Sequence, residues 1–475
     1  MPSNITLELE SGNQSAVPSH LKKKNPQFHL LLHAPKINSA VCKALLSSYI
    51  LDYPPPTLIG YVPVNDQEEQ HERGRDVFHR QNGISYISGY LKDEDRIKED
   101  DIVLVADGDS TLFQLPSDAL LAELDTQAKA ENQRLADQYT KLPLQAPQEQ
   151  SVQRYNQSIF FAAAHVSPAM NISDLETLSR FQLDSKLADP SPRLNSKLIL
   201  GSGAAMRNLF FAASKRDSSQ VMSDAATFSI FHRQQSQRRQ ATAKRHRPWS
   251  RLLVDKLRLK SASTEIEEQE ESSEAEKDLG IGLDEATALF HTVSSTFPND
   301  TTIVTSAEDT ASLPQALLSL TPPFSLHAST PHSNFSVSPN VQPTESLPNT
   351  NWRTTPLLTR LQSTRVPSIL SIPKREATIW PSLWFQPYAR VLLQQYLRKA
   401  SSQEVASEAA VGGERWWDRR GGRGGVWTTE GEWIDARELC WEFGDEIFAD
   451  GLKGWEEKII ESFEDAASDD GGGEP

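Results

Sequence analysis

The sequence predicts an α/β protein in which a mostly parallel sheet is flanked by helices. Strand-like apolar runs alternate with segments of helical apolar spacing from residue 28 onward, and this alternation is typical of parallel sheets covered by helices. The apolar run 102–106 leads directly into Asp107-Gly108-Asp109-Ser110, so carboxylates follow a strand. Hydrophobic residues make up only 37% of the 475, and there are 29 prolines, which favours an ordered core interrupted by disordered segments.

The elements of the first half follow from apolar spacing and from the residues that bound each run. "FHLLLHA" is an apolar run between two prolines and predicts the first strand. The other predicted elements are a helix at 37–53, a strand after the prolines 54–56, a helix at 77–91, a strand at 101–106 and a long helix at 115–142 with Ser117 as its N-cap.

The second half continues the alternation and ends in an aromatic-rich segment. We expect strands at 158–166 and 366–372, a strand, glycine turn and helix within 193–215, and helices at 218–240 and 379–400. The block 279–292 resumes the globular pattern after an insert. Six of the ten tryptophans lie after residue 415, which indicates a small lobe packed through aromatic rings.

Composition along the chain divides it into ordered and flexible parts. The main domain is predicted at 27–400, with disordered inserts at about 236–278, which is basic and then acidic, and at 324–350, which is rich in Ser, Pro and Thr. The remaining segments are expected to be a disordered N-terminal tail at 1–26, a linker at 401–425, the Trp-rich lobe at 426–462 and an acidic tail at 463–475.

Charge and motif content exclude several functions. The net charge is -16, from 48 basic and 64 acidic residues, which argues against nucleic acid as a partner. No P-loop, zinc-ligand spacing or Ser/His/Asp constellation supports an NTPase, zinc or hydrolase function. No apolar run is long enough to span a membrane, so we expect a cytoplasmic protein, or one of the secretory pathway or Golgi if the N-terminus is truncated. The single pair Cys42 and Cys440 says little about the redox compartment.

The carboxylates after the strand 102–106 have two interpretations. One is a polar turn that ends a buried strand. The other is a metal and nucleotide site, because open α/β sheets bind ligands at the carboxyl ends of their strands. Asp107 and Asp109 would then supply the hard oxygen ligands that Mn²⁺ or Mg²⁺ requires, and the ion would bridge the phosphates of a sugar nucleotide.

Several blocks, in order, resemble a group of fungal proteins similar to the glycosyltransferase domain of the procollagen lysyl hydroxylases. The resemblance covers roughly residues 27–397 and rests on "FHLLLHAPKINSAVCKALLSSYILDYPPP", "DDIVLVADGDSTLFQLP", "PRLNSKLILGSGAAMRNLF", "SDAATFSIFHRQQ", "GIGLDEATALF" and "WPSLWFQPYARVLL". It implies a GT-A-like (Rossmann-like) fold and a metal-dependent transfer of sugar from a nucleotide sugar, expected to be a UDP-sugar, to an unknown acceptor.

The resemblance also implies roles for particular residues, each with a structural alternative. Asp107 would contact the metal or the ribose, or would cap the strand end, and Asp109 would help hold the metal. Asn195 and Ser196 would line the nucleotide-sugar pocket, or form a simple turn. The implied catalytic residues are Asp224, which would otherwise cap its own helix, and Asp284, which would otherwise cap a helix formed by "EATALF".

Departures from the family pattern leave a second hypothesis open. Ser110 stands where the pattern has its second carboxylate, Lys197 replaces the glycine of Asn-Ser-Gly, Ala225 replaces a glutamine, and Ser371 stands where the relatives have a metal-binding histidine. The chain is therefore either a glycosyltransferase or a catalytically degenerate relative that acts as a binding or accessory factor.

Overall fold

The computed structural model describes most of the predicted main domain and part of the Trp-rich end. These are residues 26–62, 83–139, 155–164, 193–217, 223–245, 278–293, 301–304, 313, 317–319, 352–353, 355–360, 363–372, 379–399, 422–448 and 454–455. The predicted acidic tail and the predicted inserts at 324–350 and beyond residue 245 lie outside them, as does the N-terminal tail up to residue 25.

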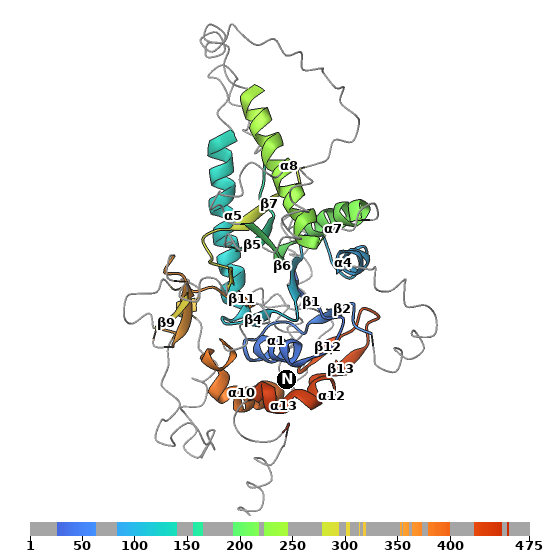
Figure 1. The fold of residues 1–475 in the computed structure, drawn as a ribbon, viewed down its shortest axis with the longest axis vertical. Helices are drawn as coiled ribbons and strands as arrows, with labels where there is room; N and C mark the ends of the chain where they lie inside the picture. Colours follow the sequence, from blue (N-terminus) through green and yellow to red (C-terminus); the bar gives the residue numbers. More distant parts are fainter. Residues whose placement is uncertain are drawn as a thin grey trace, which may run out of the picture.

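An eight-stranded mixed sheet forms the centre of the protein, in the order β13–β12–β2–β1–β3–β6–β5–β7 (Figure 1). The pairs β12–β2, β2–β1, β1–β3 and β5–β7 are parallel, whereas β13–β12, β3–β6 and β6–β5 are antiparallel. The predicted α/β class with a mostly parallel sheet is thus confirmed. The strands are β1 (Phe28–His33), β2 (Thr57–Ile59), β3 (Ile102–Asp107), β5 (Ile159–Ala164), β6 (Arg193–Ser202), β7 (Ile281–Asp284), β12 (Gly425–Trp427) and β13 (Trp433–Asp435).

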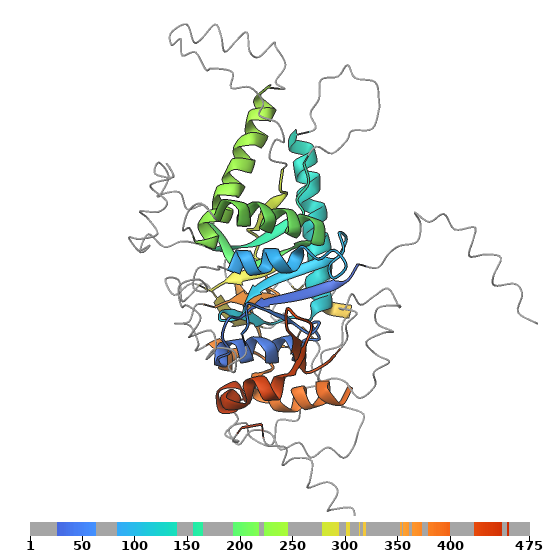
Figure 2. The same ribbon diagram turned by 90° about the vertical axis from the view of Figure 1, so that its right-hand side faces the viewer.

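Helices cover both faces of this sheet (Figures 1 and 2). One face carries α4 (Gly83–Leu91), α7 (Gly203–Asp217) and α8 (Asp224–Arg245), and the other carries α1 (Ser39–Ile50), α10 (Ala389–Lys399), α12 (Ala436–Cys440) and α13 (Gly444–Phe448). In β1, Leu30 and Leu32 join one buried cluster and Leu31 joins the other. Burial on both sides explains why this strand is apolar at consecutive positions.

The remaining elements flank the central sheet. A three-stranded sheet has the order β4 (Thr111–Phe113), β11 (Ile369–Ser371) and β8 (Phe290–Thr292), and β9 (Thr301–Val304) pairs with β10 (Leu357–Arg360). The long helix α5 covers Ser117–Tyr139, and short 3-10 turns cover η4 (Leu317–Ser319), η7 (Gln386–Tyr388) and η8 (Trp441–Phe443).

Two local expectations differ from the structure. The block "EATALF" was expected to form a helix, but it forms a turn that leads into β8. Ser117 was expected to cap α5, but it is the first helical residue and its hydroxyl donates to the carbonyl of Asp52. In addition, α8 continues as a helix to Arg245, inside the segment expected to be a disordered insert from residue 236.

The Trp-rich end of the chain adds to the edge of the central sheet. Trp427 of β12 pairs with Thr57 of β2, and the Tyr49 hydroxyl of α1 donates to the carbonyl of Gly425 at 3.0 Å. A disulfide joins Cys42 of α1 to Cys440 of α12, with their Cα atoms 5.8 Å apart. The segment predicted as a lobe at 426–462 therefore packs against the main domain, through the pairing of β12 with β2 and through the disulfide.

Among the described helices, none is both long enough and apolar enough to cross a bilayer.

Candidate functional site

Asp107 lies at the carboxyl end of β3, beside the carboxyl end of β1. The parallel register pairs it with His33, the last residue of β1, and the Gly108 N–H donates to the His33 carbonyl at 2.9 Å. A Cβ atom at Gly108 would lie 3.1 Å from a methyl of Val41 and 3.2 Å from that carbonyl. The glycine between the two aspartates therefore lets the turn approach β1 and α1 closely.

The Asp107 carboxylate is held by two side chains of this chain. The Ser110 hydroxyl donates to Oδ2 at 2.8 Å, and the Lys197 ammonium lies 2.9 Å from the same oxygen. The Asp109 N–H lies 3.3 Å from the other oxygen, Oδ1. The negative charge at this strand end is thus balanced from within the protein.

Lys197 reaches Asp107 because β6 is irregular at this point. The pairing of β5 with β6 jumps from Phe161 opposite Ile199 to Ala162 opposite Asn195, so residues 196–198 form a bulge. A bulge bends its strand and changes where its side chains point. Ser196, half-buried, and Lys197, exposed, both lie on this bulge.

Asn195 connects the bulge to the small three-stranded sheet. Its amide nitrogen donates to the hydroxyl oxygens of Thr292 in β8, at 2.9 Å, and Ser371 in β11, at 3.2 Å. Its Oδ1 accepts from the Lys197 N–H at 3.0 Å. The N–H of Ile372, the residue after Ser371, donates to the Ser110 carbonyl. Since Ser110 also binds Asp107, these polar contacts form a closed ring at the end of β3.

Three of the four positions that depart from the family pattern therefore meet at one place. Lys197 and Ser110 bind the Asp107 carboxylate, and Ser371 accepts from Asn195. In the sequence these positions are far apart, whereas in the structure their side chains belong to one connected set of hydrogen bonds and ion pairs. Asp107, Asn195 and Ser196, all predicted to bind the nucleotide sugar, belong to the same region, which we call the Asp107 site.

Asp109 faces away from this ring toward α1. Its Oδ1 accepts from the Asn38 side-chain amide at 2.7 Å. The Asn38 Oδ1 in turn caps α1 by accepting from the N–H groups of Ala40 and Val41. Asp109 thus helps to fix the start of a helix, and its contact with Asn38 gives it a structural role.

The Asp107 carboxylate, the ligand expected for Mn²⁺ or Mg²⁺, is already paired with a cation of the protein. Mg²⁺ is usually held by one or two carboxylates together with waters and substrate phosphates, and here the Lys197 ammonium contacts Asp107. Within the described ranges, no group of three or more His, Cys, Asp and Glu side chains is arranged to hold a metal.

The side chains of Asp224 and His33 both lie close to Gly83 at the start of α4. A Cβ atom at Gly83 would lie 3.2 Å from His33 Nε2 and 3.4 Å from Asp224 Oδ2. Ser223, rather than Asp224, caps α8, because its hydroxyl oxygen accepts from the Ala226 N–H. Burial lowers the pKa of His33, against the opposing charges of Asp107 and Asp109.

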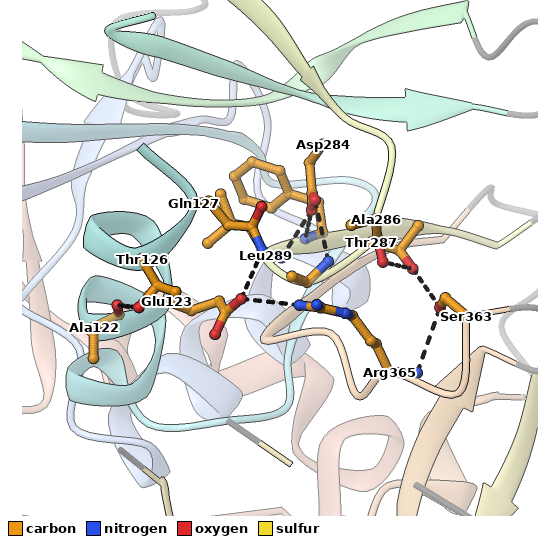
Figure 3. Close-up of polar contacts among 12 residues, drawn as sticks. Ala122, Glu123, Thr126, Gln127, Asp284, Ala286, Thr287, Leu289, Ser363 and Arg365 are labelled. Carbon is orange, nitrogen blue, oxygen red and sulfur yellow. Dashed lines mark hydrogen bonds and ion pairs between the residues drawn. The ribbon is translucent and has the colours of Figure 1, made fainter. Parts of the chain in front are cut away.

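Asp284, the second predicted catalytic residue, is buried at the end of β7 (Figure 3). One oxygen accepts from the Ala288 N–H at 3.1 Å, and the other from the N–H groups of Leu289 and Phe290, each at 2.8 Å. Burial raises its pKa to about 6, although these hydrogen bonds oppose the shift. Asp284 therefore holds the turn between β7 and β8, and only 3% of its surface is exposed to a substrate.

A polar network next to Asp284 ties α5 to the loop before β11 (Figure 3). The Glu123 carboxylate accepts from the Gln127 amide at 2.8 Å and forms an ion pair with Arg365 at 3.2 Å. The hydroxyl groups of Thr287 and Ser363 lie 3.0 Å apart. These contacts position the turn that follows Asp284.

Sequence reasoning missed the parts of the site that depend on strand pairing. His33 is half-buried at the end of β1, and only the pairing of β1 with β3 makes it the register partner of Asp107. Thr292 was not singled out, yet it binds Asn195. His33 ends a predicted parallel strand, and this position alone could have indicated that it lies near Asp107. Nothing in the sequence distinguishes Thr292.

No protein-family model matches this chain, and no curated protein matches its sequence. The class of the protein is therefore defined by the fold and the site: an α/β protein with a charged polar site at the carboxyl ends of β1 and β3.

Proposed function

We propose that this protein is a GT-A-like nucleotide-sugar-binding protein that works without a divalent metal, as a binding or accessory factor and not as a metal-dependent transferase. The ion pair between Lys197 and Asp107 carries this proposal. The ordered sequence blocks support the choice of ligand class, and the position of Asp107 at the carboxyl end of a strand supports the location.

Lys197 provides the positive charge that a diphosphate needs. Its side chain is 46% exposed, so the ammonium is accessible to solvent while it contacts Asp107. A lysine ammonium is a flexible point charge that binds phosphate well. Ser196, on the same bulge, offers a hydroxyl group for the sugar, while Asn195 holds the bulge through Thr292 and the Lys197 N–H. The proposed ligand is a UDP-sugar.

Calorimetry with UDP-glucose and UDP-galactose tests this proposal. We expect binding in the presence of EDTA, with at least a tenfold loss of affinity in Lys197→Ala. Lys129→Ala is a matched control, because Lys129 is an exposed lysine in an ion pair on α5. Binding that requires Mn²⁺, or that is unchanged in Lys197→Ala, would contradict the proposal.

A metal-dependent glycosyltransferase is the second candidate. One observation favours it: Asp107 and His33 end adjacent parallel strands, where α/β sheets bind their ligands. Release of UDP from a UDP-sugar that is stimulated by Mn²⁺ and abolished by Asp107→Ala would establish this candidate. The same result would end the binding-only proposal.

The compartment is also a matter of proposal. The cytoplasmic expectation rests on the absence of a long apolar run, whereas the disulfide between Cys42 and Cys440 favours the alternative, the secretory pathway.

A further inference from the structure

The buried disulfide favours folding of this protein in an oxidising compartment. Cys42 and Cys440 are each only 1% exposed, and they join α1 to α12. The bond is buried between α1 and α12. Trp455 lies next to it, because its indole N–H donates to the Cys440 carbonyl. Structural disulfides form and persist in the secretory pathway and are rare in the cytosol.

A sequence that is modified in that pathway lies on the described surface. Asn156-Gln157-Ser158 has the Asn-x-Ser pattern of N-glycosylation acceptors. Asn156 is exposed and lies just before β5. Its neighbours are fixed, because the Gln157 N–H donates to Asn132 at 2.7 Å and the Ser158 N–H donates to the Gly280 carbonyl at 3.0 Å.

Strand directions place Asn156 at the edge of the sheet opposite the Asp107 site. β5 and β3 are both antiparallel to β6, so they run in the same direction. The register pairs Ile159 with Gly201 and Ile102 with Ser202, so β5 and β3 begin at the same edge. Asn156 precedes the start of β5, whereas Asp107 ends β3. A bulky group on Asn156 would leave the Asp107 site open.

We propose that Asn156 carries an N-linked glycan, attached as the chain enters the secretory pathway. The amide nitrogen of Asn156 forms the new bond to C1 of the oligosaccharide. The bond between that C1 and the diphosphate of a polyisoprenyl-diphosphate donor breaks, and the amide loses one proton. The cell's oligosaccharyltransferase supplies the donor and catalyses the transfer. The other Asn-x-Ser/Thr sequences, at Asn4, Asn13, Asn171, Asn299 and Asn334, lie outside the described residues.

Mass spectrometry of the full chain from the cells that produce it tests this proposal. Removal of N-glycans by an amidase in heavy-oxygen water converts a glycosylated asparagine to labelled aspartate. We expect the label at Asn156 in the native chain, and the peptides of Cys42 and Cys440 linked before reduction. Unlabelled Asn156 would overturn the proposal, whatever the state of the cysteines.

Variants identify the site on intact protein. Asn156→Gln and Ser158→Ala each remove the acceptor pattern and should each remove one glycan from the chain, seen as a faster band on a gel. Asn208→Gln is the matched control, because Asn208 is exposed on α7 and is followed by Leu and Phe. An unchanged band in both Asn156→Gln and Ser158→Ala would contradict the proposal. The labelling of the native chain does not depend on whether either variant folds.

Discussion

The ammonium group of Lys197 lies 2.9 Å from the carboxylate of Asp107, across the pair of strands β6 and β3. This ion pair is the clearest difference between the site of this chain and the metal site that its sequence blocks imply. Ser110 donates to the same carboxylate oxygen. The oxygen of Asp107 that could bind a metal ion is thus occupied by two groups of the protein itself.

The double change Ser110→Asp and Lys197→Gly should create a divalent-metal site. It removes the competing ammonium and adds a carboxylate three residues after Asp107. We expect Mn²⁺ affinity to rise at least tenfold above that of the native chain, measured by calorimetry. The same double change combined with Asp107→Ala is the control and should bind no better than the native chain. Equal affinity in the native chain and the double variant would contradict this prediction.

Asp284→Asn should strongly destabilise the fold. The two carboxylate oxygens accept three backbone N–H groups, and an amide would turn an NH₂ group toward at least one of them. Leaving a buried donor without its acceptor costs roughly 1–3 kcal/mol. Urea unfolding measures the loss, with Glu285→Gln as the control because Glu285 is the exposed neighbour. Equal stability of the two variants would show that the turn does not need the carboxylate.

Asp284 should also make stability depend on pH in a defined direction. Burial raises its pKa to about 6, above the ordinary value of 3.8, so the folded state binds this proton more tightly than the unfolded state. Its contribution is complete below about pH 4 and is lost as pH rises through 6, by up to ~3 kcal/mol. Carbon NMR of the Asp284 carboxyl should give a midpoint near 6. A midpoint near 4 would contradict the assignment.

Replacing Cys42 and Cys440 by serine should loosen the attachment of the C-terminal segment. The bond closes a loop of 398 residues in sequence separation, and removal of a native disulfide costs roughly 2–5 kcal/mol. Hydrogen exchange should increase first in β12, β13 and α12, because they are the elements that the bond holds against α1 and β2. Uniform exchange across the whole sheet would contradict this local effect.

The sequence predicts five of the eight strands of the central sheet, β1, β2, β3, β5 and β6, but not all of their partners. β1 and β3 are apolar at consecutive positions because both faces are covered, so their identity as buried strands was visible. The direction of β6 and its bulge at 196–198 depend on pairing with β3 and β5, which apolar spacing does not encode. Lys197 could therefore be recognised as a departure, but not as the partner of Asp107.

Asp284 and the cysteines show a second limit of the sequence. The short block after Asp284 suits a helix by its composition, yet three of its backbone N–H groups turn back to the carboxylate, and this tertiary contact overrides local propensity. Cys42 and Cys440 are two cysteines far apart in the chain, and only the packing of α12 against α1 brings them within bonding distance. Long-range contacts decide both cases.

The pairing of β2 with β12 and the bond between Cys42 and Cys440 have a consequence for synthesis. A ribosome that adds about 5–20 residues per second needs on the order of 20–80 s to make the 398 residues between the two cysteines. During that time β2 lacks its neighbour β12, and the thiol of Cys42 stays unpaired because Cys440 has not yet been made. Final closure of the sheet is thus a late event on the nascent chain. Trapping of free thiols during a pulse-chase experiment should find Cys42 reduced on all but the longest ribosome-bound chains, and early loss of that thiol would contradict this order. A newly made molecule would therefore depend for about a minute on chaperones that cover an unpaired strand edge.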